Sequence, residues 1–393
     1  MALLGSVVER PGPGSPGPAL GRAVSVEDAP DVTEPPSRGS IEPELTTVAD
    51  DEVVVHWPGS DGCPARVERR IGLEPDTPVC VAGIDTRTLP RPPGARLATV
   101  ATVNDLHFGE TVCGVVAGTD VGPVLSSEPG EPPYPALMSE AAAEEVGRAD
   151  PDLVVARGEL TDAGRAGELE AFLARWQGRF AERLAWVRGN HDAAPGSSVS
   201  GPAMLERHVE GLTVALLDTA VPGEAAGRLT GEQLQWLDEL AARADRPVLA
   251  MGHHPPFVPD PSAEAKGAPE RSFGLDDESS AALVALVARR PAIVAYASGH
   301  THRNRVRRFA STGATPWIEV ASVKDFPGSW AELRVFDGGL LHVHRRISRP
   351  DALRWSDRCR ALVFGLYPRY AFGRLGDRCF PIPLRRVSTR STS

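Results

Sequence analysis

The segment LATVATVNDLH, at residues 97–107, carries the most information about the fold class of this chain. Its first seven residues form a nearly continuous apolar run, which is typical of a buried strand, and Asp105 and His107 follow where that run ends. In α/β scaffolds, the loops at the carboxyl ends of strands present the catalytic groups. The segment therefore predicts a buried strand with a polar site at its end.

The same arrangement recurs four times further along the chain. Apolar runs that we interpret as strands lie at 153–156, 184–187, 248–251 and 293–297. Each ends close to a polar cluster, and the clusters are Gly158-Glu159, Gly189-Asn190-His191-Asp192, Gly252-His253-His254 and Gly299-His300-Thr301-His302. Predicted helices lie between these runs, at 136–148, 167–177, 229–243 and 278–289. The alternation of strands and helices predicts a sheet-based α/β core.

The five clusters together contain carboxylate, imidazole and amide groups in about the number that two adjacent metal ions need. If each strand continued through its motif, alternation would place Asp105 and His107 on one side, and the same holds for His300 and His302. Either triplet alone is a weak signal, because turns and surface pairs have the same composition. The ordered set of five clusters predicts a two-metal hydrolase.

This order and spacing resemble the calcineurin-like metallophosphoesterases, whose motifs are DxH, GD, GNH followed by an acidic residue, GH and GHxH. The resemblance implies two facing mixed β-sheets flanked by helices, the metallo-dependent phosphatase fold. It also implies a centre of two divalent or trivalent ions, with Mn, Fe or Zn as the candidates. The metal ligands that it implies are Asp105, His107, Glu159, Asn190, His253, His300 and His302.

The resemblance also implies catalytic roles for three further side chains. His191 corresponds to the histidine that stabilises charge on the phosphate or protonates the leaving oxygen. Asp162 matches the acidic residue that orients this histidine, and His254 corresponds to a residue that faces the substrate pocket. For His254, a packed histidine without a catalytic role is an equally good interpretation.

One branch of the superfamily fits best. Leu217-Asp218-Thr219, Gly227-Arg228-Leu229-Thr230 before a Gln-x-x-Trp-Leu helix, and His253-His254-Pro255-Pro256 resemble bacterial class III cyclic-nucleotide phosphodiesterases. This resemblance covers roughly residues 96–345 and implies hydrolysis of small phosphodiesters, with cyclic nucleotides among the candidates, by a metal-activated hydroxide.

The departure from the family pattern is Glu159, where the family has Asp. It leaves open a phosphomonoesterase, or a metal-binding scaffold with weakened catalysis. Since we see no compensating insertion or deletion around Glu159, we expect the substitution Glu159→Asp to raise turnover.

Composition narrows the class of protein further. The chain has 393 residues, of which 41% are hydrophobic and 24% charged, and its net charge is −10, so we expect no stable nucleic-acid binding. It contains no run of about 18 apolar residues, and we therefore expect no membrane span. Its five cysteines form no CxxC pair, and no secretory signal is visible, so a cytoplasmic location is expected. The oligomeric state is left open.

The composition changes along the chain and predicts four regions. Residues 1–50 are rich in Pro, Gly and acids and are expected to form a disordered leader, and residues 51–95 a small N-terminal β appendage. The metallophosphoesterase domain is expected at 96–348, and residues 349–393 form a basic, aromatic tail that we expect to dock on the acidic domain. The pair Lys324-Asp325 lies in a Pro/Gly loop and is expected to be solvated.

Overall fold

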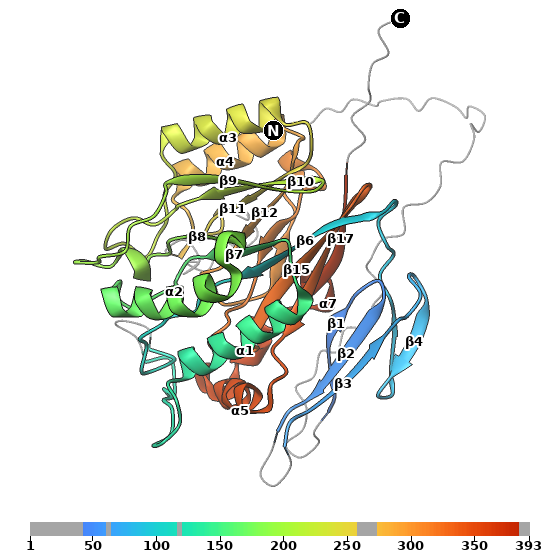
Figure 1. Ribbon diagram of the computed structural model, residues 1–393, viewed down its shortest axis with the longest axis vertical. Helices are drawn as coiled ribbons and strands as arrows, with labels where there is room; N and C mark the ends of the chain where they lie inside the picture. Colours follow the sequence, from blue (N-terminus) through green and yellow to red (C-terminus); the bar gives the residue numbers. More distant parts are fainter. Residues whose placement is uncertain (1–41, 60–63, 116–119, 258–272, 385–393) are drawn as a thin grey trace, which may run out of the picture. The chain divides into compact units, whose positions relative to one another are not determined.

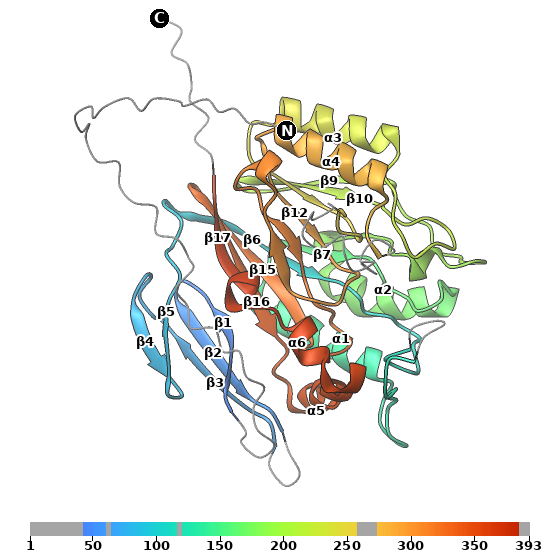
Figure 2. The same ribbon diagram turned by 180° about the vertical axis from the view of Figure 1, so that it is seen from behind.

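Two six-stranded mixed sheets form the centre of the fold, in a computed structural model that describes residues 42–59, 64–115, 120–257 and 273–384 (Figures 1 and 2). The first sheet has the order β17 (Cys379–Pro383), β16 (Gly339–Arg346), β15 (Ser329–Phe336), β6 (Arg96–Val103), β7 (Leu153–Arg157) and β8 (Leu184–Val187). The second has the order β13 (Arg305–Arg307), β14 (Trp317–Glu319), β12 (Ile293–Ser298), β11 (Val248–Met251), β10 (Leu212–Leu217) and β9 (Met204–Val209). The predicted α/β fold of two mixed sheets is confirmed.

Apolar side chains fill the space between the sheets, and helices cover their outer faces. Val100 and Val155 of the first sheet share one buried cluster with Leu216 and Leu249 of the second. The first sheet is covered by α1 (Tyr134–Ala149) and α2 (Ala166–Phe180), and the second by α3 (Gly231–Arg243) and α4 (Asp277–Arg289). Both faces of the parallel strands are therefore buried, which explains why these strands are continuous apolar runs.

Five parallel strands carry the five sequence clusters. Strands β6, β7 and β8 pair in parallel in the first sheet, as do β10, β11, β12 and β14 in the second. The motif loops follow the carboxyl ends of β6, β7, β8, β11 and β12. Loops from two sheets thus meet at one edge of the sandwich.

The N-terminal β appendage consists of two small sheets. One has the order β1 (Glu44–Val48), β2 (Glu52–Trp57) and β3 (Arg66–Ile71), and the other pairs β4 (Pro78–Val81) with β5 (Ile84–Arg87). Strand β1 lies inside segment 1–50, which we predicted from the sequence to be a leader. The predicted start of the β appendage at residue 51 is therefore wrong. Val48 and Val53 are buried in its core, and this tertiary packing is not visible as a periodic pattern in so short a strand. The expectation of disorder for residues 1–41 falls outside the described residues.

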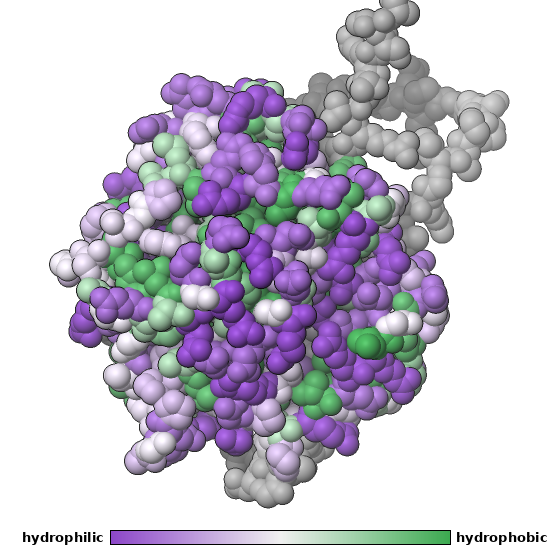
Figure 3. Space-filling model, in the orientation of Figure 1, coloured by the Kyte–Doolittle hydropathy of each residue, from purple (hydrophilic) through white to green (hydrophobic). Residues whose placement is uncertain are grey.

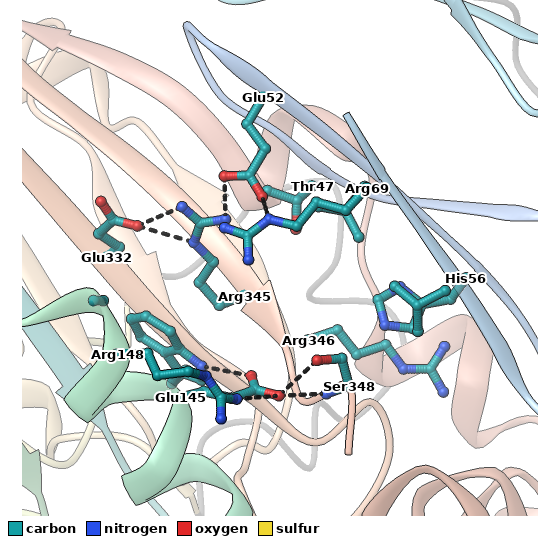
Figure 4. Close-up of a pocket in the computed structure, with 14 residues that line it drawn as sticks. Thr47, Glu52, His56, Arg69, Glu145, Arg148, Glu332, Arg345, Arg346 and Ser348 are labelled. Atoms are coloured by element: carbon teal, nitrogen blue, oxygen red, sulfur yellow. Dashed lines mark hydrogen bonds and ion pairs between the residues drawn. The ribbon is translucent and has the colours of Figure 1, made fainter. Parts of the chain in front are cut away.

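The β appendage is joined to the first sheet by buried polar contacts (Figure 4). The Thr47 hydroxyl donates to the carbonyl of His344, at 2.7 Å. The Arg345 guanidinium lies between the carboxylates of Glu52 and Glu332, at 2.6 Å from each, beside a polar cavity of about 170 Å³. Breaking one partner of such a buried pair is costly, so these contacts fix the β appendage on β15 and β16.

The C-terminal segment packs on the domain, as the sequence predicted for the tail. It contains α5 (Pro350–Arg358), α6 (Tyr367–Ala371), α7 (Leu375–Arg378) and β17, which pairs with β16. Arg360 contributes to the docking through its ion pair with Glu44 at 2.7 Å. The short 3-10 turns are Ala181–Arg183, His191–Ala193, Ala310–Thr312, Cys359–Ala361 and Val363–Gly365.

The surface carries mixed polar and apolar groups. On the face in Figure 3, hydrophilic residues predominate and apolar residues form scattered small areas. In the part of the chain that the structure describes, each helix is too short or too polar to cross a membrane.

Candidate metal centre

Glu159 is the centre around which the candidate ligands gather. Its Oε2 lies 2.6 Å from His107 Nε2 and 3.5 Å from His302 Nε2. Its Oε1 lies 3.3 Å from His253 Nε2 and 3.4 Å from His300 Nδ1. The structure therefore brings four predicted imidazoles from three strand ends around one carboxylate that is only 2% exposed.

Asp105 forms the second carboxylate of the cluster and is fully buried. Its Oδ1 lies 3.8 Å from His302 Nε2 and 3.9 Å from His253 Nδ1. The Asn104 side-chain amide donates to Asp105 Oδ2 at 2.5 Å, and the backbone N–H of His300 donates to the same carboxylate. Asp105 is thus held in place by groups from both sheets.

The backbone at the motifs differs from the strand alternation that the sequence suggested. Strand β6 ends at Val103, and both Asp105 and His107 have left-handed φ angles, of 55° and 48°. His300 and His302 also have positive φ, of 66° and 51°. Alternation along a strand is therefore the wrong reason for the convergence of these side chains. Such φ values are strained for residues other than glycine and concentrate at functional sites.

Two of the imidazoles have a defined tautomer because of what their outer nitrogen contacts. His253 Nδ1 lies 2.8 Å from the carbonyl oxygen of Arg157, which can only accept, so this nitrogen carries the proton. His302 Nδ1 lies 2.8 Å from the Asp325 carboxylate. In each case the other ring nitrogen, Nε2, points at the carboxylates of the cluster, as in histidine ligands with an outer hydrogen bond.

This arrangement fits a metal ion. Two acceptors facing each other, such as a neutral His253 Nε2 and Glu159 Oε1 at 3.3 Å, repel each other unless a proton or a cation lies between them. The side-chain oxygen of Asn190 and Nε2 of His300 are also buried without a hydrogen-bond partner. A site of imidazole, carboxylate and amide ligands suits Zn, Mn or Fe.

The charges of the two carboxylates are governed by burial and by the imidazoles. Burial would raise the pKa of Glu159, but the surrounding histidines, His107 first, outweigh it and hold this pKa well below its usual range. Burial raises the pKa of Asp105 despite the opposing effect of His302. Glu159 is therefore the principal negative charge of the cluster.

His191 and Asp162 lie together at the more open side of the cluster. His191 Nδ1 is 2.6 Å from the backbone oxygen of Asp162 and 3.7 Å from its carboxylate, while Nε2 is 4.0 Å from Glu159 Oε1. The predicted pairing is present, although its short contact is to the backbone. Burial lowers the pKa of His191, but the Glu159 charge and the bonds to Asp162 outweigh burial and raise it to about 9.

His254 is fully buried, which fits the interpretation of a packed histidine better than a position facing the substrate pocket. Its Nδ1 lies 2.7 Å from the Thr219 hydroxyl, and its ring stacks at a tilt against His300, with centroids 4.6 Å apart. Loops after β10 and β12 enclose it, since Thr219 follows β10 and His300 follows β12. His254 thus lies behind His300 in the described structure, and its catalytic role stays a prediction.

Three buried charged residues beside the cluster were missed or misjudged in the sequence. Lys324 and Asp325 are buried, at 5% and 2% exposed, and not solvated as expected. Lys324 forms an ion pair with Glu110 and Asp325 contacts His302, so each charge has a partner. Asp192 accepts the backbone N–H groups of Gly189, Leu160 and Thr161 and the Thr161 hydroxyl. The acid after GNH was a visible signal for Asp192, whereas no local pattern marks Asp325.

Comparisons with known proteins identify related phosphoesterases. The sequence profile of the calcineurin-like phosphoesterases matches residues 98–304, which is more than half of the chain. A cAMP/cGMP dual specificity phosphodiesterase of Mycobacterium tuberculosis is 35% identical over 120 residues, 27% of this chain and 37% of that protein. A glycerophosphodiester phosphodiesterase of Enterobacter lignolyticus is 29% identical over 169 residues, 39% of this chain and 57% of that protein. The matched residues thus span less than two thirds of either relative.

A solved structure supports the fold independently. The crystal structure of a dimetal phosphatase from Danio rerio superposes with a TM-score of 0.53 at 14% identity, covering 74% of this chain and all of that one. At this identity the likeness concerns the arrangement of sheets and helices.

Proposed function

The chain belongs to the calcineurin-like phosphoesterase family, and from that premise we propose that it hydrolyses small phosphodiesters at a centre of two metal ions. The single observation that carries this proposal is the buried Glu159 carboxylate with four imidazoles around it. The proposed ligands are Asp105, His107, Glu159, Asn190, His253, His300 and His302. Zn, Mn or Fe is the expected metal, because the ligands are nitrogen and oxygen atoms.

Metal ions bound here would polarise the phosphoryl oxygens and lower the pKa of bound water, which provides the nucleophile. Side chains of the protein supply the negative charge of the site and orient its histidines. Glu159 supplies negative charge between the imidazoles, and its two oxygens face different histidines, so this carboxylate would help to hold the metal ions. The contacts of Asp325 and of the Arg157 carbonyl keep the lone pairs of His302 and His253 turned inward.

His191 is the proposed proton donor to the leaving alkoxide. Its Nδ1–H donates a hydrogen bond to the backbone carbonyl of Asp162. This bond orients the ring with Nε2 toward the cluster. Because its pKa is raised to about 9, Nε2 carries a proton at neutral pH. A positioned acid of this kind typically contributes about 10² to 10⁴-fold to the rate. His191 is also among the exposed members of the cluster, with 39% of its side chain accessible, so a substrate oxygen can reach it.

The proposed substrate class, small phosphodiesters, is based partly on the activities named for two relatives. These activities are hydrolysis of cyclic nucleotides and of glycerophosphodiesters, and both substrates are small phosphodiesters. The acidic net charge of −10 also disfavours long polyanions as general substrates. We therefore propose a small phosphodiester as the substrate class.

The test is a substrate screen on metal-stripped protein reconstituted with Mn²⁺ or Zn²⁺. Bis-p-nitrophenyl phosphate, p-nitrophenyl phosphate, cAMP and cGMP are assayed in parallel, with metal content measured on the same samples. Diester turnover that is lost in His300→Ala, but kept in a His208→Ala control at an exposed site, supports the proposal. Preference for the monoester would indicate a phosphomonoesterase, and full metal content without turnover would indicate a scaffold.

A further inference from the structure

A buried carboxylate holds His302 from outside the cluster. His302 points Nε2 at Glu159 and Asp105, and its Nδ1 contacts Asp325 Oδ2 at 2.8 Å. Since the carboxylate accepts, Nδ1 carries a proton, and Nε2 is the nitrogen that faces the cluster. Asp325 therefore sets both the tautomer and the orientation of this ring. It does so from the loop between β14 and β15, beyond residue 304, where the family match ends.

Asp325 is itself held by a residue from much later in the chain. Its Oδ1 accepts from the Ser322 hydroxyl at 2.6 Å and from the Tyr367 hydroxyl at 3.0 Å. Asp325 is 2% exposed and Tyr367 is 8% exposed, so water has little access to replace either bond. A buried carboxylate needs such donors to remain in a fixed position.

The segment that carries Tyr367 is fixed against the same loops. Tyr370, one turn further along α6, donates its hydroxyl to the carbonyl of Thr301, which lies between the two histidines of the last motif. The backbone N–H of Asn304 donates to the carbonyl of Ala371 at 2.9 Å, and the Trp355 indole N–H donates to the carbonyl of Lys324 at 2.7 Å. Figure 2 shows α6 beside the ends of β15 and β16, which is consistent with these contacts.

We propose that the C-terminal segment is part of the metal site, because Tyr367 positions His302 through Asp325. The inference rests on the proposed function, since it assigns Tyr367 and Asp325 as positioning residues for one of its ligands. It places a determinant of metal affinity about 60 residues beyond the last histidine motif. Residues outside a metal's own ligands typically change metal affinity by about 10 to 100-fold when mutated.

The experiment measures metal binding directly, without reference to turnover. The full chain is stripped with a chelator and titrated with Zn²⁺ in competition with a chromophoric chelator. We expect Asp325→Asn to weaken Zn²⁺ binding by about 10 to 100-fold. Tyr367→Phe removes one hydrogen bond and should weaken binding by about three to tenfold.

The matched control is Tyr370→Phe, which removes a hydroxyl from the same helix. Its partner is the carbonyl of Thr301 and not the carboxylate that holds His302, so the loss of Zn²⁺ affinity should be clearly smaller than in Tyr367→Phe. The unfolding midpoint of each metal-free variant is measured as well, to reveal loss of packing.

Two results would overturn the inference while leaving the proposed function in place. One is a Tyr367→Phe variant that binds Zn²⁺ as the unmodified chain does. The other is an equal loss of affinity in Tyr367→Phe and Tyr370→Phe, which would mean that general packing of the segment is responsible. If the unmodified chain takes up none of Zn²⁺, Mn²⁺ and Fe²⁺, the proposed function fails, and the inference fails with it.

Discussion

Shortening Glu159 by one methylene tests whether this site is built for glutamate. The backbone of Glu159 is fixed, because its carbonyl accepts from the N–H groups of Leu106 and His107 at 2.8 and 2.9 Å. The neighbouring glycines leave no room for movement: a Cβ on Gly158 would lie 2.5 Å from His253 Nδ1, and one on Gly189 would lie 2.5 Å from the Glu159 nitrogen. The shorter side chain of Glu159→Asp must therefore withdraw its oxygens.

The size of the effect follows from this withdrawal. One carbon–carbon bond is about 1.5 Å, so the carboxylate would retreat from its present 2.6 Å contact with His107 by about 1 Å or more. A misplacement of about 1 Å at a reacting centre can reduce the rate by about a hundredfold. We therefore expect Glu159→Asp to lower turnover by about a hundredfold and to weaken metal binding. This reverses the expectation from sequence alone, which took aspartate as the better fit.

The assay combines metal content by inductively coupled plasma mass spectrometry with hydrolysis of bis-p-nitrophenyl phosphate. Glu159→Gln serves as the companion variant, because it keeps the length of the side chain and removes its charge. We expect it to retain less metal than Glu159→Asp, since a neutral amide offsets none of the charge of a cation. Turnover of Glu159→Asp at or above that of the unmodified chain would refute the reasoning and show that the shorter side chain fits.

Three further outcomes follow from the site. His191→Ala should reduce diester turnover by about 10² to 10⁴-fold with metal content unchanged, and parallel loss of both would make His191 a ligand. Because the pKa of His191 is raised to about 9, its proton is present at neutral pH and lost above pH 9, so turnover should fall as pH rises through that value. A profile that stays flat to pH 10 would contradict this role. Asp192→Ala leaves three backbone N–H groups and a hydroxyl without their acceptor and should lower the free energy of unfolding by about 2 to 4 kcal/mol in urea titrations; a change below about 0.5 kcal/mol would contradict it.

The positions of the candidate ligands along the chain were predictable because two local signals coincide. A strand buried on both faces is a continuous apolar run, and the loop that follows it is polar, so residues 97–107 give both a strand and a site. The same signals place Glu159, His253 and His300 at strand ends. Parallel pairing then brings these ends to one edge, which is a general property of such sheets.

Other features depend on contacts between distant segments and could not be predicted. In the sequence, Asp325 belongs to a Pro/Gly loop that is expected to be solvated. In the structure, α6 packs over this loop and Tyr367 donates to Asp325. Strand β1 is too short to show a period and is recognisable only because it pairs with β2. The enclosure of His254 depends on Thr219, 35 residues earlier in the chain. Propensity and periodicity are local, and they contain no information about such partners.

The left-handed backbone explains why the side chains meet although alternation along a strand does not apply. Five of the seven proposed ligands have positive φ, and each such residue costs on the order of 1 to 3 kcal/mol, which the surrounding structure must offset. The surroundings here do so through the backbone: the Glu159 carbonyl accepts from His107, and the Gly158 carbonyl accepts from Asp105. The loop after β7 therefore holds the loop after β6 in place. A change of backbone in either loop would move the proposed ligands on both. Gly158 and Gly189 tighten the same coupling, because a Cβ on either would lie 2.5 Å from His253 Nδ1 or from the Glu159 nitrogen, so the ligand loops form one interlocked set.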